Sequence, residues 1–299
     1  MQHASIFELY FLSYTFIMKT LLIPVDFTKA SDNAINFGAE WAKHYDYERI
    51  ILLRSFYISI FENLIMSAEF SNVNEDNINI DRENQKDELN ILCRQLSEKA
   101  GRGIKIQTAT SELPLLRSII DIIKYEQPQM ILLGSDNINN SNDAFISGNI
   151  IAIAKASPIR VLIVPSYYTY KPVHEILVPC DFNALNSLNK INSLRAVPQW
   201  HDVKILVLNV DASQPQINPD DKFKEAEFNI HDYLKNFEHQ IYYVAEKNVT
   251  DGILNFEKAN KVQLMIAMPG KYSFLYSLTH KNISEALYRN TRLPLMILK

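Results

Sequence analysis

A short apolar segment that ends in Asp-Phe occurs twice in this chain, once near the start and once just past the middle. Residues 21–27 read LLIPVDF, and residues 176–182 read ILVPCDF. An apolar run of this kind indicates a parallel strand buried on both faces, and the aspartate that follows it would lie at the carboxyl edge of the sheet. The repeat therefore predicts that one α/β unit is present twice.

A second pair of repeats closes each half of the sequence. Residues 130–134 and 160–165 (MILLG and RVLIVP) correspond to residues 264–268 and 293–298 (LMIAM and LPLMIL). Strands that alternate with helical patterns are typical of a parallel sheet with helices on both faces. We therefore predict an α/β fold of two tandem Rossmann-like domains, each with a five-stranded parallel sheet, related by a pseudo-two-fold axis. The predicted domains are residues 18–166 and 173–299.

The same patterns predict the individual elements. In the first domain we expect strands at residues 20–25, 50–53, 104–108, 130–134 and 160–165. Its helices are expected at residues 31–44, with Ser31 and Asp32 as caps, and at 81–100, 114–126 and from about 149. In the second domain we expect strands at 176–179, 203–210, 240–244, 263–267 and 293–298, and helices at 184–196, 221–236, 249–260 and 283–290. The apolar last strands, 160–164 and 293–298, are expected to pair and form a pseudo-dimer within the chain.

Composition and motifs restrict the function. The net charge of −4 gives no electrostatic basis for nucleic acid or an anionic membrane as a partner. Cys93 and Cys180 lack CxxC or histidine spacing, so we expect no disulfide, no zinc site and a cytoplasmic location. Because Cys180 lies in a buried strand position, we expect its thiol to be inert. The seven histidines are scattered, which predicts no metal site. The sequence contains no nucleophile elbow and no Walker loop, and we identify no catalytic residue.

The first seventeen residues are treated separately. Residues 6–17 are apolar, but the run is too short to cross a bilayer and contains Glu8. A basic n-region and a small-residue cleavage site, which mark a secretory signal, are missing. We interpret residues 1–17 as a disordered or non-native extension, with a membrane or partner anchor as the alternative.

Three features together resemble the universal stress protein family in its tandem form. They are the Pro-x-Asp-Phe end of the first strand (24–27), the glycine turn after the fourth strand, and the segment ASPIRVLIVP at 156–165. The resemblance implies an adenine nucleotide alpha hydrolase-like fold. It also implies a nucleotide-binding or regulatory protein of the stress response, usually dimeric through its last strand, with no established chemical step. Members of the ATP-binding branch carry Gly-x2-Gly-x9-Gly-Ser/Thr after the fourth strand.

The first domain keeps this motif in part. Gly134 matches the first glycine, Asn137 stands in place of the second, and Ser147 and Gly148 appear in reversed order. Backbone N–H groups at such a turn and at a helix N-terminus bind phosphate, and glycine allows its close approach. The resemblance further implies that Asp26 faces the nucleoside. The candidate nucleotide-binding residues are Asp26, Gly134, Asn137, Ser147, Gly148 and Asn149.

Two observations oppose nucleotide binding. Asp136 and Asp143 place negative charge beside the proposed phosphate site, which repels phosphate unless a cation intervenes. In the second domain, Met268 and Lys271 stand at the glycine positions and Lys281 begins the replacement for the closing Gly-Ser. We therefore expect no ATP binding of the family's kind in the second domain.

Each candidate residue also has a structural explanation. Asp26 could cap a helix at a strand–turn–helix corner, as Asp181 would in the second domain. Gly134 could end the fourth strand in a tight turn, and Ser147 and Asn149 are good helix N-caps.

Three hypotheses follow for the function. The first is a regulatory protein that binds ATP, with Mg²⁺ accompanying it, in the first domain. The second is a scaffold for unidentified protein partners that binds no nucleotide, and the third is a weak ATP hydrolase. On the first hypothesis, Gly134→Val is expected to abolish binding while leaving the fold intact. The sequence leaves open whether the chain forms higher oligomers.

Overall fold

The computed structural model describes residues 18–57, 74–101, 103–136, 145–182, 190–194, 198–214, 216–268 and 291–299. Within these ranges the side chains of residues 74–78, 145–148 and 198 are not described. The predictions for residues 1–17, Asn137, Asp143, Lys271, Lys281, the helix at 283–290 and most of the helix at 184–196 therefore lie outside the described residues.

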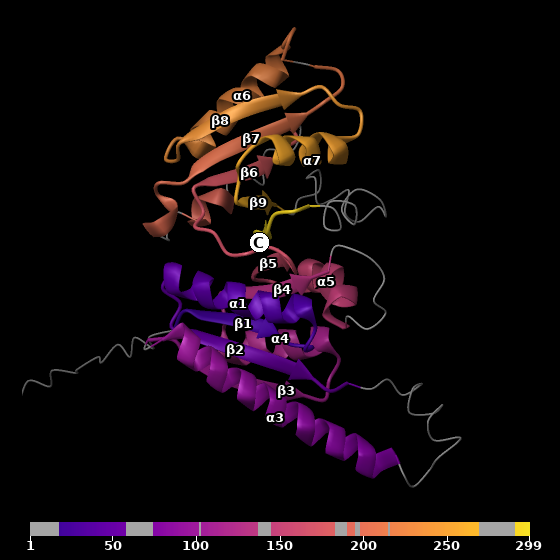
Figure 1. The fold of residues 1–299 in the computed structure, drawn as a ribbon. Coiled ribbons are helices and arrows are strands. Elements are labelled where there is room, and N and C mark those ends of the chain that lie inside the picture. The colour runs from indigo at the N-terminus through magenta and orange to yellow at the C-terminus, as the bar shows by residue number, and fades with distance from the viewer. Residues whose placement is uncertain are drawn as a thin grey trace, which may run out of the picture.

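The chain alternates strands and helices in the predicted order. The first half comprises β1 (Thr20–Pro24), α1 (Lys29–His44), β2 (Arg49–Ser55), α3 (Asn74–Ala100), β3 (Lys105–Ser111), α4 (Leu115–Glu126), β4 (Met130–Ser135), α5 (Phe145–Ala156) and β5 (Arg160–Pro165). The second half comprises β6 (Glu175–Pro179), the 3₁₀ helix η2 (Pro198–Trp200), β7 (Lys204–Val210), α6 (Asp221–Leu234), β8 (His239–Val244), α7 (Val249–Ala259), β9 (Leu264–Ala267) and β10 (Leu295–Ile297). Figure 1 shows the two halves stacked, with the C-terminus between them.

All ten described strands form one sheet in the order β3-β2-β1-β4-β5-β10-β9-β6-β7-β8. The described strands pair in parallel inside each half, and β10 pairs antiparallel with β5, with Met296 opposite Leu162. The prediction that the two last strands pair is thus confirmed. The order 3-2-1-4-5 is the same in both halves when each half is read from its outer edge to the junction.

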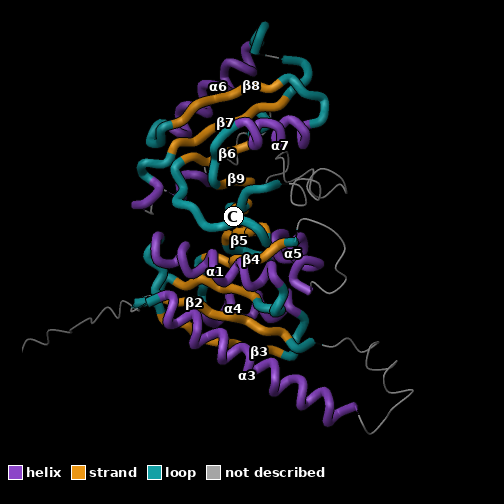
Figure 2. Tube along the Cα trace, in the orientation of Figure 1, coloured by secondary structure: helices purple, strands orange, loops and turns teal. Residues whose placement is uncertain are grey.

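Helices cover both faces of the sheet (Figures 1 and 2). Successive residues of β1 alternate between two cores, as the pleat of a strand requires. Leu21 and Ile23 belong to the core that contains the buried side of α1, whereas Leu22 packs in the core of Ile119 and Ile150 from α4 and α5. Since both faces are buried, the strands are apolar throughout, and this explains why the sequence pattern identified them.

The starts of three helices differ from the prediction. Thr28, rather than Ser31 or Asp32, is the N-cap of α1, because its Oγ1 accepts a hydrogen bond from Ser31 N at 3.3 Å. Helix α3 begins at Asn74, before the predicted start. Helix α5 begins at Phe145, so the prediction that Ser147 and Asn149 act as its N-caps is wrong.

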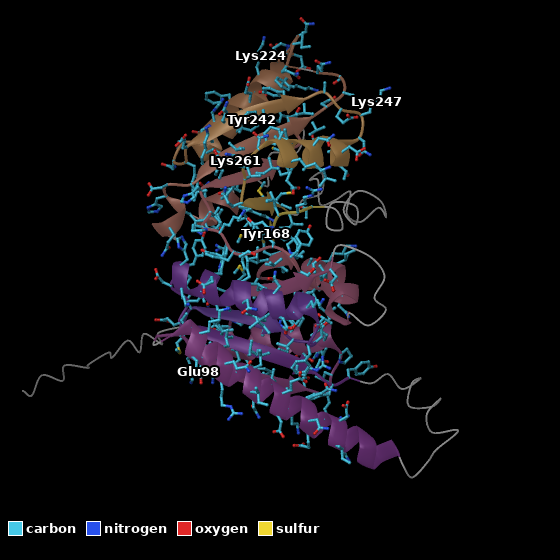
Figure 3. All side chains as sticks on the ribbon, viewed as in Figure 1. Glu98, Tyr168, Lys224, Tyr242, Lys247 and Lys261 are labelled. Atoms are coloured by element: carbon cyan, nitrogen blue, oxygen red, sulfur yellow. The ribbon has the colours of Figure 1, made fainter. Side chains whose placement is uncertain are left out.

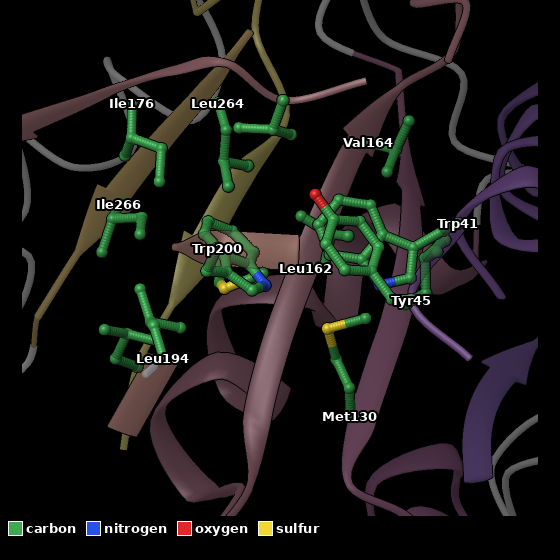
Figure 4. Packing of buried hydrophobic residues seen from close by; sticks show 14 of the residues in the cluster. Trp41, Tyr45, Met130, Leu162, Val164, Ile176, Leu194, Trp200, Leu264 and Ile266 are labelled. Atoms are coloured by element: carbon green, nitrogen blue, oxygen red, sulfur yellow. The ribbon is translucent and has the colours of Figure 1, made fainter. Parts of the chain in front are cut away.

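Aromatic rings join the two halves beside the β5–β10 pair. The Tyr45 ring at the end of α1 stacks on Trp200 of η2, with centroids 5.5 Å apart and planes 27° apart. Trp41 meets the same indole edge to face at 6.2 Å. Figure 4 shows these rings close to Leu162 and Met130 of the central strands. The junction is therefore a continuous core and not only a strand pairing.

None of the helices in the described ranges has the length and apolar character needed to cross a membrane.

Candidate functional site

The candidate site lies at the carboxyl edge of the first half, between β1 and β4. In the order β3-β2-β1-β4-β5, the chain turns to opposite sides of the sheet at β1 and β4. In open α/β sheets, ligands bind in the crevice outside this topological switch point. Asp26 follows β1 and Gly134 lies near the end of β4, so the fold brings these two candidates to one edge.

Asp26 organises the start of α1. Its Oδ1 accepts hydrogen bonds from Thr28 Oγ1 at 2.7 Å and from Thr28 N at 3.2 Å. Thr28 in turn caps the helix through Ser31 N, and the Asp26 backbone N donates to Ser31 Oγ at 3.3 Å. The adjoining Phe27 has a left-handed backbone, with φ 60°. The Asp26 carboxylate thus has a structural role at the strand–turn–helix corner, because it holds Thr28 in place. The N-cap of α1 is Thr28 itself and not Asp26.

Gly134 lies inside β4, opposite Val164 of β5, and does not end the strand in a tight turn. A Cβ at this position would overlap the Ala30 carbonyl group and lie 2.9 Å from Ser31 N. Glycine is therefore required here for the first turn of α1 to approach the strand. The expectation that Gly134→Val leaves the fold intact is wrong, because backbone atoms of a core helix occupy that space.

The ends of β4 and β5 are held close to α1. Asn33 Nδ2 donates to the carbonyl oxygens of Pro165 and Tyr168, at 2.8 and 3.1 Å. Ser166 N donates to Ser135 O at 2.8 Å, which continues the β4–β5 ladder by one bond. These bonds fix the backbone on one side of the candidate crevice.

A cation at this edge was not predicted from the sequence. Arg54, near the end of β2, donates from Nη1 to Val25 O at 3.2 Å and from Nε and Nη2 to Gln85 Oε1 at 2.9 and 2.7 Å. Its guanidinium carbon lies 5.3 Å from the centre of the Phe27 ring. The signal was present in the sequence, because a charge that directly follows a buried parallel strand arrives at the carboxyl edge just as Asp26 does.

Arg54 is half-buried and has no carboxylate within ion-pair distance among the described residues. Burial lowers its pKa, whereas the negative charges of Asp26, Asp81 and Glu88 raise it. A cation removed from water is stabilised by a nearby anion. The edge therefore carries a positive group whose charge no described carboxylate neutralises by direct contact.

The second half lacks this charge. The strand register places Leu53 opposite Pro24 and Leu208 opposite Pro179, so Asn209 occupies the position equivalent to Arg54. Asn209 Nδ2 donates to Cys180 O at 3.2 Å, in the way that Arg54 donates to Val25 O. The equivalent edges thus share a hydrogen bond and differ in charge.

The remaining candidates lie at the start of α5. Ser147 and Gly148 are among its first four residues, whose backbone N–H groups have no acceptor inside the helix. Asn149 follows them and is half-buried. Such N–H groups, together with the positive end of the helix dipole, favour an anion.

Two predicted absences concern cysteine and metal chemistry. Burial and the charge of Asp181 raise the pKa of the Cys180 thiol to about 12, which favours the protonated thiol over the reactive thiolate. Cys93 and Cys180 are both free. In the described part of the chain, His, Cys, Asp and Glu side chains form no group of three or more that could hold a metal ion.

This fold, with its sheet order and its edge at the switch point, defines a Rossmann-like α/β protein. The model of the universal stress protein family matches residues 18–165. Residues 18–165, the first half of the chain, belong to the universal stress protein family.

Solved structures agree with this fold. A universal stress protein from Archaeoglobus fulgidus is similar with a TM-score of 0.66 and 14% identity, over 94% of this chain and 96% of that chain. Two proteins from Pseudomonas aeruginosa, one of them functionally unknown, have TM-scores of 0.57 and 0.54 at 13% and 14% identity. Both matches cover 94% of this chain, and 93% and 92% of those proteins. A search of curated proteins found no match.

Proposed function

We propose that this protein is a cytoplasmic stress-response regulator that binds an adenine nucleotide at the carboxyl edge of its first half. The observation that carries the proposal is the half-buried Arg54 guanidinium, which lacks a direct ion pair with any described carboxylate. An anionic ligand in the adjacent crevice would supply the missing negative charge. The asymmetry between Arg54 and Asn209 supports binding in the first half and not in the second.

Two further features support a nucleotide over other anions. The family match covers the whole first half, including β1, β4 and α5. The first N–H groups of α5 follow β4 in the chain and have no acceptor inside the helix, so a phosphate at the switch point could accept hydrogen bonds from them. In this proposal Mg²⁺ enters with the phosphates, since no described cluster of side chains would hold the ion by itself.

A scaffold without a nucleotide is the second candidate, and specific contacts favour it. Asp26 already accepts two hydrogen bonds from Thr28, and Gly134 is required for packing against Ala30. Both residues therefore have structural reasons to be present even if no ligand binds. In that case the chain would act through protein partners.

We also propose the domain division that the repeats indicate, with residues 18–166 and 173–299 as two tandem units. The matching strand order of the two halves and the antiparallel junction between β5 and β10 support it. The junction uses the last strand of each unit, so association of two whole chains would need another surface.

The first experiment asks whether an adenine nucleotide binds. Small molecules are released from freshly purified protein by denaturation and identified by mass, and ATP with Mg²⁺ is then titrated calorimetrically. The regulator hypothesis expects an adenine nucleotide or saturable binding. An empty protein that gives no heat with ATP supports the scaffold.

Two matched pairs of variants locate the site. Arg54→Gln is expected to weaken ATP binding by about tenfold or more, because a charge-assisted contact is lost, whereas Arg94→Gln on the exposed side of α3 leaves it unchanged. Asp26→Asn keeps an oxygen that accepts hydrogen bonds from Thr28. The variant therefore tests how the negative charge of Asp26 affects ATP binding while the hydrogen bonds at the start of α1 are kept. Asp181→Asn is its control in the second half. Unchanged affinity in both Arg54→Gln and Asp26→Asn would contradict the proposed location.

A further inference from the structure

A cavity of about 710 Å³ lies at the opposite edge of the sheet from Asp26, where the two halves meet. Its walls include the amino ends of β1, β4 and β5 and the carboxyl end of β10, which reaches this edge because β10 runs antiparallel to β5. Ser193 and Trp200 of the second half complete the lining. The cavity therefore needs both halves, and its volume falls within the roughly 300–1,000 Å³ usual for small-molecule sites.

Aromatic rings form one side of the cavity. Trp41, Tyr45, Tyr47 and Trp200 all line it. Tyr45 and Trp200 are stacked, and the Trp41 and Tyr45 ring centres lie 4.2 Å apart. Such faces bind planar apolar groups. The chain contains two tryptophans, and both line this cavity.

The charged residues that line the cavity are all positive, namely Lys19, Arg160 and Lys299. Lys19 Nζ donates to Tyr45 O at 2.5 Å and lies 4.8 Å from the centre of the Tyr47 ring. Arg160 Nη2 donates to the carbonyl and hydroxyl oxygens of Ser193, each at 3.2 Å. Within the described ranges, none of the three cations makes an ion pair with a carboxylate.

The charges around Lys19 favour the binding of an anion in the cavity. Burial is the largest influence on its pKa and lowers it. Asp46 and Glu48 act in the opposite direction, and the positive charge of Arg160 lowers the pKa further. Asp46 Oδ2 already accepts from Gln199 Nε2 at 2.6 Å, and Glu48 accepts from the Lys19 backbone N at 3.0 Å. An anion between Lys19 and Arg160 would offset their mutual repulsion.

Two buried donors among the lining side chains add an independent observation. Tyr45 is 1% exposed and Trp41 is 2% exposed. Among the described residues, the Tyr45 hydroxyl and the Trp41 Nε1 have no hydrogen-bond partner of good geometry, although the Tyr47 hydroxyl interacts with the indole. Buried donors without a partner are rare in native proteins, and each one needs an explanation such as a ligand or a water molecule.

We propose that this cavity is a second binding site, for a small molecule that combines an aromatic ring with a phosphate or carboxylate group. The ring lies against the aromatic side formed by Trp41, Tyr45, Tyr47 and Trp200. The anionic group lies between Lys19 and Arg160, both of which have donors to spare. The site is separate from the nucleotide edge and does not depend on nucleotide binding there.

The test uses the full chain and phenyl phosphate as the probe, followed by calorimetry and by tryptophan fluorescence. Because both tryptophans line the cavity, a change in their emission reports binding at this site. Saturable binding with a change in emission is expected. Benzoate in a parallel titration shows whether a carboxylate replaces the phosphate. Inorganic phosphate has only the anionic group and benzyl alcohol has only the aromatic ring. Both are expected to bind at least about tenfold more weakly than phenyl phosphate.

Matched variants separate the site from general charge effects. Lys19→Gln combined with Arg160→Gln is expected to weaken phenyl phosphate binding by about tenfold or more. Lys224→Gln combined with Lys247→Gln makes the same change in net charge on exposed residues at the outer end of the second half (Figure 3) and is expected to leave binding unchanged. If the first double variant fails to fold, Arg160→Gln alone is expected to weaken binding, since it removes one of the two cations proposed to hold the anion.

Three results would overturn the proposal. One is the lack of saturable binding by either aromatic anion. Another is equal affinity for inorganic phosphate and phenyl phosphate, and the third is equal affinity in the wild type and the cavity variants. Arg54→Gln distinguishes the two sites, because it alters the Asp26 edge and is expected to leave phenyl phosphate binding unchanged.

Discussion

The close approach of α1 to β4 at Gly134 leads to the sharpest prediction about stability. In Gly134→Ala the new Cβ would overlap the Ala30 carbonyl group and lie 2.9 Å from Ser31 N. These are backbone atoms of a helix that the buried residues Ala34 and Phe37 hold against the sheet, so no side-chain rotation relieves the overlap. The first turn of α1 must move, and overpacking of this kind costs about 3 kcal/mol of unfolding free energy.

Gly38→Ala is the matched control within the same helix. Its Cβ would lie 2.6 Å from Ile23 Cδ1, which is the end of a flexible side chain. Replacement of glycine by alanine inside a helix also gains about 1 kcal/mol of helix propensity. The net loss of stability for Gly38→Ala is therefore expected to be about 1 kcal/mol or less.

Urea unfolding followed by circular dichroism measures both variants against the wild type. The reasoning is refuted if Gly134→Ala unfolds within about 0.5 kcal/mol of the wild type, the range of an uneventful surface substitution. It is equally refuted if Gly38→Ala is the more destabilised of the two. Neither variant requires a ligand, so the outcome is independent of the proposed nucleotide site.

Three further predictions concern single side chains. Thr28→Ala removes the acceptor for Ser31 N and is expected to cost about 1 kcal/mol in urea unfolding. Tyr45→Phe removes a buried hydroxyl without a partner and is expected to leave stability unchanged or to raise it in the same assay, whereas a loss above about 1 kcal/mol would reveal a hydrogen bond to water or ligand. Glu257 has a pKa raised above 4.5 by burial, only partly offset by the hydrogen bond from Arg292 N. A raised folded-state pKa means that the folded protein holds the proton more tightly, so stability falls as the pH rises from 4.5 through the folded-state pKa. Glu257→Gln is expected to flatten this decline in thermal unfolding measured across that pH range, and an unchanged pH profile would contradict the assignment.

The sequence predicted those parts of the fold whose burial requires apolar residues in a recognisable local pattern. Strands buried on both faces must be apolar, and this is why β1 and its repeat β6 were identified within one residue at each end. The pairing of β5 with β10 was also predicted, because two equally apolar edge strands each require a partner.

The candidate site was predicted only in part. Asp26 and Gly134 were placed correctly at one edge, because parallel strands deliver their ends to the same side of a sheet. The cap at Thr28 was missed because several residues near that corner have capping side chains, and the backbone geometry selects among them. Arg54 was missed because its importance depends on burial beside Gln85, which lies on a helix distant in sequence.

The sequence by itself determined the α/β class, the repeated strand order and the family, since each of these follows from periodic burial and from short motifs. Only the tertiary structure decided what Gly134 contacts and which residues line the cavity between the halves. Ala30 lies against Gly134, and Lys19, Arg160 and Trp200 line one cavity, although these residues are far apart along the chain. Contacts between residues that are distant in sequence depend on the tertiary structure. Steric and electrostatic forces act between neighbours in space, whatever their separation along the chain.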